Sequence, residues 1–219
     1  MNPLELDFAG ERLCAHGSGA LHWPAENLLV VSDLHLGKSE RIARRGGALL
    51  PPYETAETLD RLCRDIEATG AATVVCLGDS FDDLAAGAAL DDTHRATIAR
   101  LQAGRRWVWI EGNHDPGPLD LGGAHLAEMR LGPLTFRHIA AGAAAPGEIS
   151  GHYHPKARLR YARRPCFMVD RRRMILPAYG CYTGGLDWTT PVLRALFDEK
   201  AIAYLTGPSV MAVPVPRAA

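Results

Sequence analysis

The run Leu28-Leu29-Val30-Val31-Ser32-Asp33-Leu34-His35 passes directly from four aliphatic residues to an acid and an imidazole. Consecutive aliphatic residues, two of them β-branched, are typical of a strand buried on both faces, as in the parallel sheets of α/β proteins. Asp33 and His35 follow the point where this strand would end. Since side chains two positions apart in extended backbone point the same way, the pair would face one cation. The run therefore predicts an α/β fold with a cation site at one edge of its sheet.

The same arrangement of a strand followed by a polar motif recurs along the chain. The further motifs are Gly78-Asp79, Gly112-Asn113-His114-Asp115 and Gly151-His152-Tyr153-His154. His138 lies in a fifth apolar run. Strand ends that meet at one sheet edge would gather these side chains into a single site. Carboxylate, amide carbonyl and imidazole groups together suit a pair of divalent ions such as Mn, Fe, Zn or Mg.

Each candidate ligand has a specific use in a two-metal site. Asp79 follows the second strand, and a single carboxylate can bridge two cations roughly 3.5–4 Å apart. Asn113 offers a neutral carbonyl oxygen, which suits a site whose charge is already balanced by carboxylates. His138, His152 and His154 add imidazoles, and the last two could reach different ions. Because a lone Asp or His is more often a turn or core residue, the prediction depends on all five motifs together.

Two helices are expected between the first three strands. The first shows helical spacing of its apolar residues, Leu59, Leu62, Cys63 and Ile66. Gly70 is placed to end it, and the second helix is expected to run from Asp91 or Asp92 to Gly104. Strands that alternate with helices indicate parallel pairing with right-handed crossovers.

The second half of the chain is typical of a second, more antiparallel sheet packed on the first. Its short expected strands are Leu134–Phe136, Glu148–Ser150, Cys166–Val169 and Arg173–Leu176. The alternating N-terminal stretch, about residues 4–24, is expected to be a hairpin on this second sheet. The tail after about Gly207 is expected to be poorly ordered. Without an internal repeat or a linker, residues 1–219 are expected to form one domain.

Composition and charge exclude several classes of protein. The chain has 219 residues, 47% of them hydrophobic, and a formal net charge of −1, an ordinary composition for a globular protein. No apolar stretch approaches the length of a membrane span, and no signal-peptide pattern opens the chain, so we expect no membrane partner. The five cysteines include no close pair, which argues against a disulfide framework and a thiolate zinc site. A cytoplasmic protein with reduced thiols is expected.

Two basic segments follow the first and last metal motifs. Their candidate substrate-binding residues are Lys38, Arg41, Arg44 and Arg45 in the first segment, and Arg158 and Arg160 in the second. Rows of cations follow a polyanion backbone without reading its bases, which would suit a nucleic acid. A solvated basic face, or arginines that hold one nucleotide-sized substrate, explains the charges equally well.

The order of the five motifs resembles that of the calcineurin-like metallophosphoesterases. The resemblance implies the metallo-dependent phosphatase fold, a four-layer α-β-β-α sandwich of two mixed sheets packed face to face with flanking helices. It also implies two divalent metal ions. The first ion would be held by Asp33, His35, Asp79 and His154, and the second by Asp79, Asn113, His138 and His152.

The resemblance implies further roles beside the ligands. His114 would be the catalytic histidine, and Asp115 the carboxylate that orients its ring. Many relatives carry an Asp three positions after the bridging Asp, followed by an Arg; here Asp82 keeps the carboxylate and Asp83 stands in place of the arginine. Asp82 is expected to orient a ligand, with a helix-capping or loop carboxylate as the alternative.

Longer stretches resemble one branch of this family, the bacterial ligase-associated metallophosphoesterases, or DNA damage response endonucleases. They are residues 21–24, 32–39, 50–59 and 151–155. Members of that branch are encoded beside a DNA ligase, an Lhr-type helicase and an exonuclease. The resemblance therefore implies a DNA endonuclease or phosphodiesterase in DNA repair, with manganese as the favoured metal and single-stranded or structured DNA as the substrate.

Two other functions remain as alternatives. A small-molecule phosphodiesterase or pyrophosphatase, such as a UDP-diacylglucosamine hydrolase, would be expected to carry an apolar lid, whereas the insertions here are basic or rich in Ala and Gly. A metal-free scaffold protein would be expected to have lost ligands, whereas every ligand position is occupied.

Overall fold

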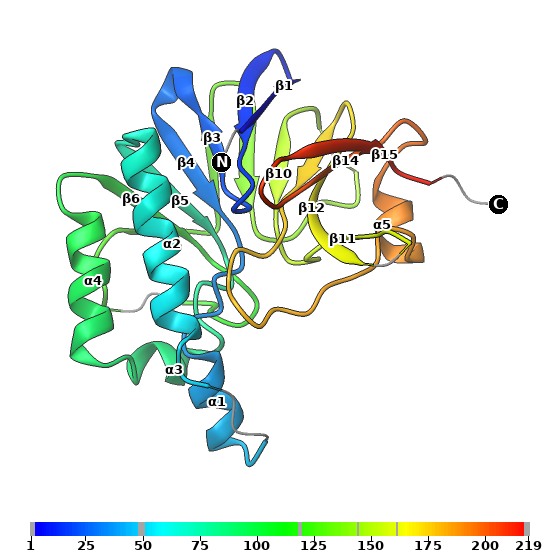
Figure 1. Ribbon diagram of the computed structural model, residues 1–219. Helices are drawn as coiled ribbons and strands as arrows, with labels where there is room; N and C mark the ends of the chain where they lie inside the picture. The colour runs from blue at the N-terminus through cyan, green and yellow to red at the C-terminus, as the bar shows by residue number, and fades with distance from the viewer. Residues whose placement is uncertain (1–2, 48–50, 118–119, 144, 161, 217–219) are drawn as a thin grey trace.

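The N-terminal part of the chain forms a seven-stranded sheet in the computed structural model, which describes residues 3–47, 51–117, 120–143, 145–160 and 162–216 (Figure 1). In spatial order its strands are β1 (Leu4–Phe8), β2 (Glu11–Ala15), β3 (Leu21–Trp23), β4 (Leu28–Val31), β5 (Thr73–Leu77), β6 (Arg106–Ile110) and β7 (Ala124–Leu126). The strands from β4 to β7 run parallel, as the alternation of strands and helices predicts. The carboxyl ends of β4, β5 and β6 therefore meet at one edge.

Two long helices cover the outer face of this sheet. They are α2 (Glu54–Thr69) and α4 (Asp92–Gln102), and their buried residues share one apolar cluster with the sheet (Figure 1). α2 ends at Gly70, whose left-handed backbone (φ 64°) closes the last turn. Asp91 caps α4 by accepting a hydrogen bond from the backbone N–H of His94. Both predicted helices are confirmed.

The second half of the chain forms an eight-stranded mixed sheet. In spatial order its main strands are β15 (Met211–Pro214), β14 (Ile202–Leu205), β12 (Arg163–Val169), β13 (Arg173–Ile175), β10 (Glu148–Ser150), β9 (Leu134–Arg137) and β8 (Glu128–Leu131). β11 (Lys156–Arg158) pairs with β12 only. β10 runs parallel to both of its neighbours, whereas the other pairs are antiparallel.

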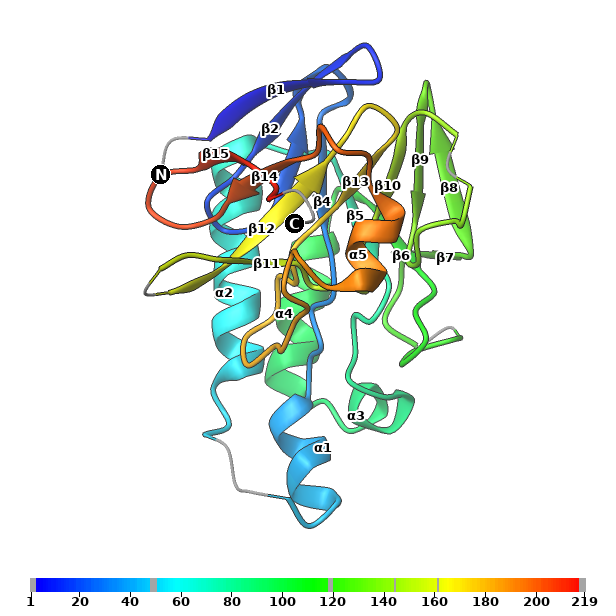
Figure 2. The same ribbon diagram turned by 90° about the vertical axis from the view of Figure 1, so that its right-hand side faces the viewer.

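The two sheets pack face to face, with helices outside. Val30 and Val75 of the first sheet share an apolar core with Phe136 and Ile149 of the second. The outer face of the second sheet forms another apolar cluster with α5 (Pro191–Leu196), which lies on the far side of that sheet from α2 and α4 (Figure 2). These four layers confirm the predicted α-β-β-α sandwich. That residues 1–219 form one domain stays a prediction.

The N-terminal hairpin lies in the first sheet, so its predicted place on the second sheet is wrong. β2 pairs with β3, and β3 pairs antiparallel with β4. Only the short turn η1 (Pro24–Glu26) separates β3 from β4, and a connection of this length favours pairing with the next strand. Leu6 and Phe8 do lie in the core between the sheets. Alternation shows which face of a hairpin is buried, but not which sheet the hairpin extends.

The expected disorder after Gly207 is also wrong for the part of the tail that the structure describes. Met211–Pro214 forms β15, which pairs in antiparallel register with β14 at the edge of the second sheet. Pro214 is tolerated there because the outer side of an edge strand has no partner to which its N–H would donate. Residues 217–219 lie outside the described residues.

Two short helices flank the strand ends that carry the metal motifs. α1 (Lys38–Arg44) follows β4, α3 (Leu84–Ala88) follows β5, and both project from this end of the molecule (Figures 1 and 2). A Cβ at Gly37 would lie 2.9 Å from the Cβ of Ala86, so only glycine allows α1 to approach α3 so closely. None of the helices in the described ranges is long and apolar enough to cross a membrane. All five cysteines are free thiols.

Candidate metal centre

The seven predicted ligands converge at one end of the two sheets. Asp33, His35, Asp79 and Asn113 come from the ends of β4, β5 and β6, whereas His138, His152 and His154 follow β9 and β10. Backbone hydrogen bonds join neighbouring loops, from the N–H of His35 to the oxygen of Asp79 at 2.9 Å, and from the N–H of Gly151 to the oxygen of His138 at 2.9 Å. The loops that carry the ligands therefore support one another.

The first group consists of Asp33, His35 and His154, whose potential ligand atoms lie within 4.8 Å of one another. Nε2 of His154 is 3.2 Å from Oδ1 of Asp33 and 3.4 Å from Nε2 of His35. Asp33 and His35 are buried, and His154 is partly buried. These three residues are the ligands predicted for the first ion, and the fourth predicted ligand, Asp79, lies in the other group.

The second group consists of Asp79, His138 and His152, again within 4.8 Å. Nε2 of His138 is 3.4 Å from Oδ2 of Asp79 and 3.3 Å from Nδ1 of His152. Oδ1 of Asn113 lies 3.0 Å from the same His138 nitrogen, so Asn113 lies beside this group, and its role as a ligand stays a prediction. Asp33 Oδ1 is 3.9 Å from Nδ1 of His138, which places the two groups side by side. The bridging role of Asp79 stays a prediction.

The chemistry of these atoms fits cations. Nδ1 of His138 lies 2.8 Å from the carbonyl oxygen of Leu77, so a neutral ring keeps its proton on Nδ1 and presents a lone pair at Nε2. That lone pair faces the oxygens of Asp79 and Asn113 and the nitrogen of His152. Acceptors that converge on one another in a largely buried place repel unless a positive charge lies among them. Oxygen and imidazole donors of this kind suit Mn, Fe or Zn.

The backbone of the ligand-bearing loops is strained. Five predicted ligands have positive φ angles: Asp33 (54°), His35 (46°), Asp79 (47°), His152 (70°) and His154 (45°). Left-handed backbone at a non-glycine residue is unfavourable, on the order of 1–3 kcal/mol, and persists only where the surroundings enforce it. Such residues gather at functional sites, which supports a functional use of this cluster.

The histidines of the cluster keep its carboxyl groups ionised. Burial alone would raise the pKa of Asp33, but the hydrogen bond and charge of His154 and the charge of His138 hold that pKa below its ordinary value. Burial is likewise outweighed at Asp79, where His138, in its doubly protonated form, lowers the pKa to about 2 by its hydrogen bond and charge. Burial would lower the pKa of His138, but Asp79 and Asp33 raise it. The carboxylates are therefore in the form that binds a cation.

Asp82 lies beside the ring of His35, and its predicted role in orienting a ligand stays a prediction. Its Oδ1 lies 2.9 Å from Nδ1 of His35, which leaves Nε2 of that ring for the first group. Asp82 is fully buried and pairs with Arg41 of α1, and Nζ of Lys38 lies 3.6 Å from Oδ1. Burial opposes ionisation here, but His35, Arg41 and Lys38 hold the pKa of Asp82 well below its ordinary value.

The predicted contact between Asp115 and the ring of His114 is wrong. Nδ1 of His114 lies 2.8 Å from the carbonyl oxygen of Asp82, and Nε2 lies 4.0 Å from Oδ2 of Asp79. The carboxylate of Asp115 instead accepts backbone N–H groups at 2.8–3.2 Å, those of Asp79, Ser80, Phe81 and Gly112. Asp115 therefore holds the turn after β5 against the loop after β6, and a backbone oxygen orients His114.

Two residues of the site lie outside the predicted set. Ser32 donates a hydrogen bond from its hydroxyl to Oδ2 of Asp33, and the N–H of His152 donates to the same carboxylate at 3.0 Å. Gly151 allows this approach, because a Cβ there would lie 1.8 Å from Oγ of Ser32. The glycine directly before His152 is the one sequence signal for this close contact.

The predicted substrate-binding cations fall into two places. Those of α1 lie beside carboxylates: Lys38 and Arg41 by Asp82, Arg44 by Glu40 and Asp83, and Arg45 by Asp83. Arg158 and Arg160 are exposed in the β11–β12 hairpin, away from α1 (Figure 1). The charges of the α1 cations are therefore partly balanced within the protein.

An open cleft of about 490 Å³ adjoins the second group. Asn113 and His138 contribute to its wall, together with Arg137, Glu128 and the exposed side chain of Ile139. A substrate that reaches His138 from solvent could enter along this cleft.

Comparison with known proteins agrees with this geometry. The sequence pattern of the calcineurin-like phosphoesterases matches residues 27–176, which contain both groups. The chain belongs to the calcineurin-like phosphoesterase family. The crystal structure of Pseudomonas putida nuclease MPE superposes with a TM-score of 0.77 at 28% sequence identity, over 97% of this chain and 100% of that chain. No curated protein matches the sequence.

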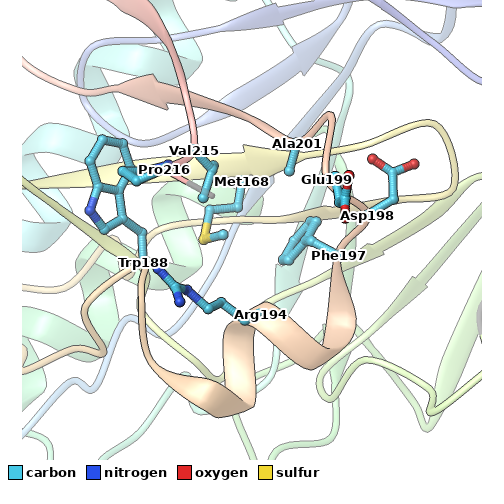
Figure 3. Close-up of a pocket in the computed structure, with 9 residues that line it drawn as sticks. All are labelled: Met168, Trp188, Arg194, Phe197, Asp198, Glu199, Ala201, Val215 and Pro216. Atoms are coloured by element: carbon cyan, nitrogen blue, oxygen red, sulfur yellow. The ribbon is translucent and has the colours of Figure 1, made fainter. Parts of the chain in front are cut away.

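Calcineurin-like phosphoesterases use divalent metal ions. The two groups described above are the candidate ligands for such ions in this chain. A separate cavity of about 340 Å³ lies between the second sheet and α5, where Met168, Trp188 and Phe197 line it (Figure 3). None of the predicted site residues lines that cavity. That cavity is therefore separate from the candidate metal centre.

Proposed function

We propose that this phosphoesterase is a metal-dependent nuclease that hydrolyses phosphodiester bonds in DNA. The observation that carries the proposal is the pair of adjacent acceptor groups, built on Asp33 and Asp79, in a chain whose fold is shared with a nuclease. The two groups would hold two divalent ions, for which manganese is the favoured metal. Bound ions of this kind lower the pKa of a water molecule and neutralise phosphate oxygens.

The chain's own residues would position the phosphate and manage protons. In the first group, Asp82 holds the ring of His35, and the hydroxyl of Ser32 holds the carboxylate of Asp33. His114 is the proposed proton donor to the leaving alkoxide, because its side chain is 36% exposed and lies beside Asp79. Since Nδ1–H donates its hydrogen bond to the carbonyl oxygen of Asp82, Nε2 carries a proton to donate only when the ring is an imidazolium. No covalent intermediate with the protein is required.

The finer parts of the proposal rest on the resemblance of longer stretches to the ligase-associated branch. They are an endonuclease activity on single-stranded or structured DNA and a role in DNA repair in the cytoplasm. Functional links to a DNA ligase, an Lhr-type helicase and an exonuclease belong to the same proposal. The nuclease whose fold the chain shares supports a nucleic acid substrate.

A small phosphodiester is the second candidate substrate. The ion pairs of α1 favour it, because cations already balanced by Asp82, Asp83 and Glu40 attract a polyanion less strongly. The exposed positions of Arg158 and Arg160 on the β11–β12 hairpin, away from α1, favour a long substrate instead.

A side-by-side assay tests the proposal. Single-stranded DNA, duplex DNA and bis-p-nitrophenyl phosphate would be incubated with the protein and Mn²⁺, with EDTA and Asp79→Asn as inactive controls. Internal cleavage of DNA that requires the metal and Asp79 is expected. Hydrolysis of the small diester alone would favour the second candidate. A protein that binds no Mn²⁺ when the metal is supplied and hydrolyses none of the substrates would be a scaffold.

A further inference from the structure

Tyr182 shares the unusual backbone conformation of the metal ligands. Eight non-glycine residues in the described ranges have positive φ, and five of them are the predicted ligands. Ala9 lies in the turn of the β1–β2 hairpin, and Asn27 closes η1, so both have ordinary turn positions. The eighth is Tyr182, with φ 56°. A bulky aromatic residue is unfavourable there, and an outlier of this kind points to a use.

The loop that carries Tyr182 connects two ligand-bearing segments. This connection from β13 to α5, gold to orange in Figure 1, first meets the end of β4, where the N–H of Gly180 donates to the oxygen of Asp33 at 3.0 Å. It then meets the loop after β10, where the N–H of Leu186 donates to the oxygen of Tyr153 at 3.2 Å. Two residues span at most roughly 7 Å, so Tyr182 starts within that distance of Gly180 at the rim of the first group.

The backbone around Tyr182 is held in place while its ring stays exposed. The N–H of Cys181 donates to Oγ1 of Thr58 at 3.2 Å, and Nζ of Lys156 donates to the oxygen of Thr183 at 3.0 Å. Tyr182 is 44% exposed as a whole residue, and its ring has no aromatic partner within the described part of the chain. An exposed aromatic side chain on a backbone that is already held loses less conformational entropy when a flat ligand covers it than one on a mobile loop would.

We propose that Tyr182 is a stacking platform for a base of a single-stranded nucleic acid whose phosphate lies at the metal centre. This inference rests on the proposed nuclease function and specifies its substrate as unpaired strand. Every base presents an aromatic face, so stacking on a tyrosine strengthens binding without selecting a sequence. A base within a duplex is already stacked on its neighbours, whereas an unpaired base is free to cover the ring. The ammonium of Lys156 adds a positive charge beside the same loop.

Two DNA strands of equal length and charge isolate the contribution of stacking. One is an oligothymidylate, and the other carries stable abasic residues in place of the bases near the cleavage site. With Mn²⁺, Tyr182→Gly should raise KM for the base-bearing strand roughly 5- to 100-fold and leave kcat nearly unchanged. KM and kcat for the abasic strand should be the same in the variant as in the parent protein. Tyr182→Phe should restore binding, because the stacking face remains.

Two controls separate stacking from damage to the fold. Glycine suits the left-handed position, so Tyr182→Gly should unfold at the same or a higher temperature than the parent protein. Tyr53, which is 68% exposed at the start of α2, provides a matched variant, Tyr53→Ala, expected to leave both strands unaffected. Equal losses on both strands, or no loss on either, would overturn the role of Tyr182 while DNA cleavage itself stands. Failure of the parent protein to cleave either strand would overturn the nuclease proposal instead.

Discussion

Oδ1 of Asp115 accepts a hydrogen bond from the backbone N–H of Asp79 at 3.0 Å, and Oδ2 accepts those of Ser80 and Phe81. Asp79 is a predicted ligand in left-handed backbone, and this buried carboxylate holds its turn. Burial, with the charge of Asp79, raises the pKa of Asp115 to about 6 despite these N–H donors. The residue after the candidate catalytic histidine thus acts on the ligand loop and not on the imidazole.

Asp115→Asn should therefore damage metal binding more than proton transfer. An amide presents one acceptor where the carboxylate presents two, so at least one buried N–H of the turn after β5 would lose its partner. The free energy of unfolding should fall by roughly 1–3 kcal/mol in urea with EDTA present. Metal analysis should find less metal per chain. An unchanged metal content with a selective loss of activity on substrates with poor leaving groups would restore the predicted role in orienting His114.

Asp82 predicts a particular dependence of stability on pH in the metal-free protein. Its pKa in the folded state is held well below the unfolded value, which is roughly 3.9. A depressed carboxyl pKa stabilises the fold above the unfolded pKa, and this stabilisation is lost as the pH falls towards the folded pKa. Asp82→Asn should thus lower the free energy of unfolding by about 1.5–3 kcal/mol at pH 7. The difference in free energy of unfolding between the variant and the parent protein should become smaller as the pH falls from about 4 to about 2. A difference that does not change with pH would show that ionisation of Asp82 is not its source.

His114→Ala should separate chemistry from metal binding. His114 lies beside the second group without belonging to it, so the metal content should persist. Loss of a proton donor should lower kcat by roughly 10²–10⁴ for DNA, whose leaving alkoxide needs a proton. A nitrophenolate leaves without one, so bis-p-nitrophenyl phosphate should be affected much less. Loss of metal in the variant would instead make His114 a ligand, in line with its place in a third group with His35 and Asp82.

The convergence of the candidate ligands could be predicted from sequence because each follows a strand, and parallel strands bring their ends to one edge. The hydrogen-bond partners of Asp82 and Asp115 could not be predicted in this way, because they depend on how the loops after the strands fold back. Arg41 pairs with Asp82 from helix α1, which no apolar pattern in the sequence indicates. The direction of the Asp115 side chain depends on the turn at residues 79–81, whose N–H groups it accepts. β15 is not predictable from sequence for a related reason: Pro214 argues against a central strand but is compatible with an edge strand.

Arginine substitutions decide whether a long polyanion is the substrate. Arg158→Ala combined with Arg160→Ala should weaken cleavage of single-stranded DNA and leave bis-p-nitrophenyl phosphate hydrolysis nearly intact. Each lost phosphate contact should flatten the log–log salt dependence of binding by roughly 0.7. Arg41→Ala should behave differently, because Arg41 pairs with the carboxylate behind His35 and should lower both activities together. Arg100→Ala, at an exposed position of α4, serves as the control for loss of positive charge alone. If the Arg158 and Arg160 double variant keeps the parent salt slope, these cations do not contact the DNA backbone and the small phosphodiester becomes the better substrate.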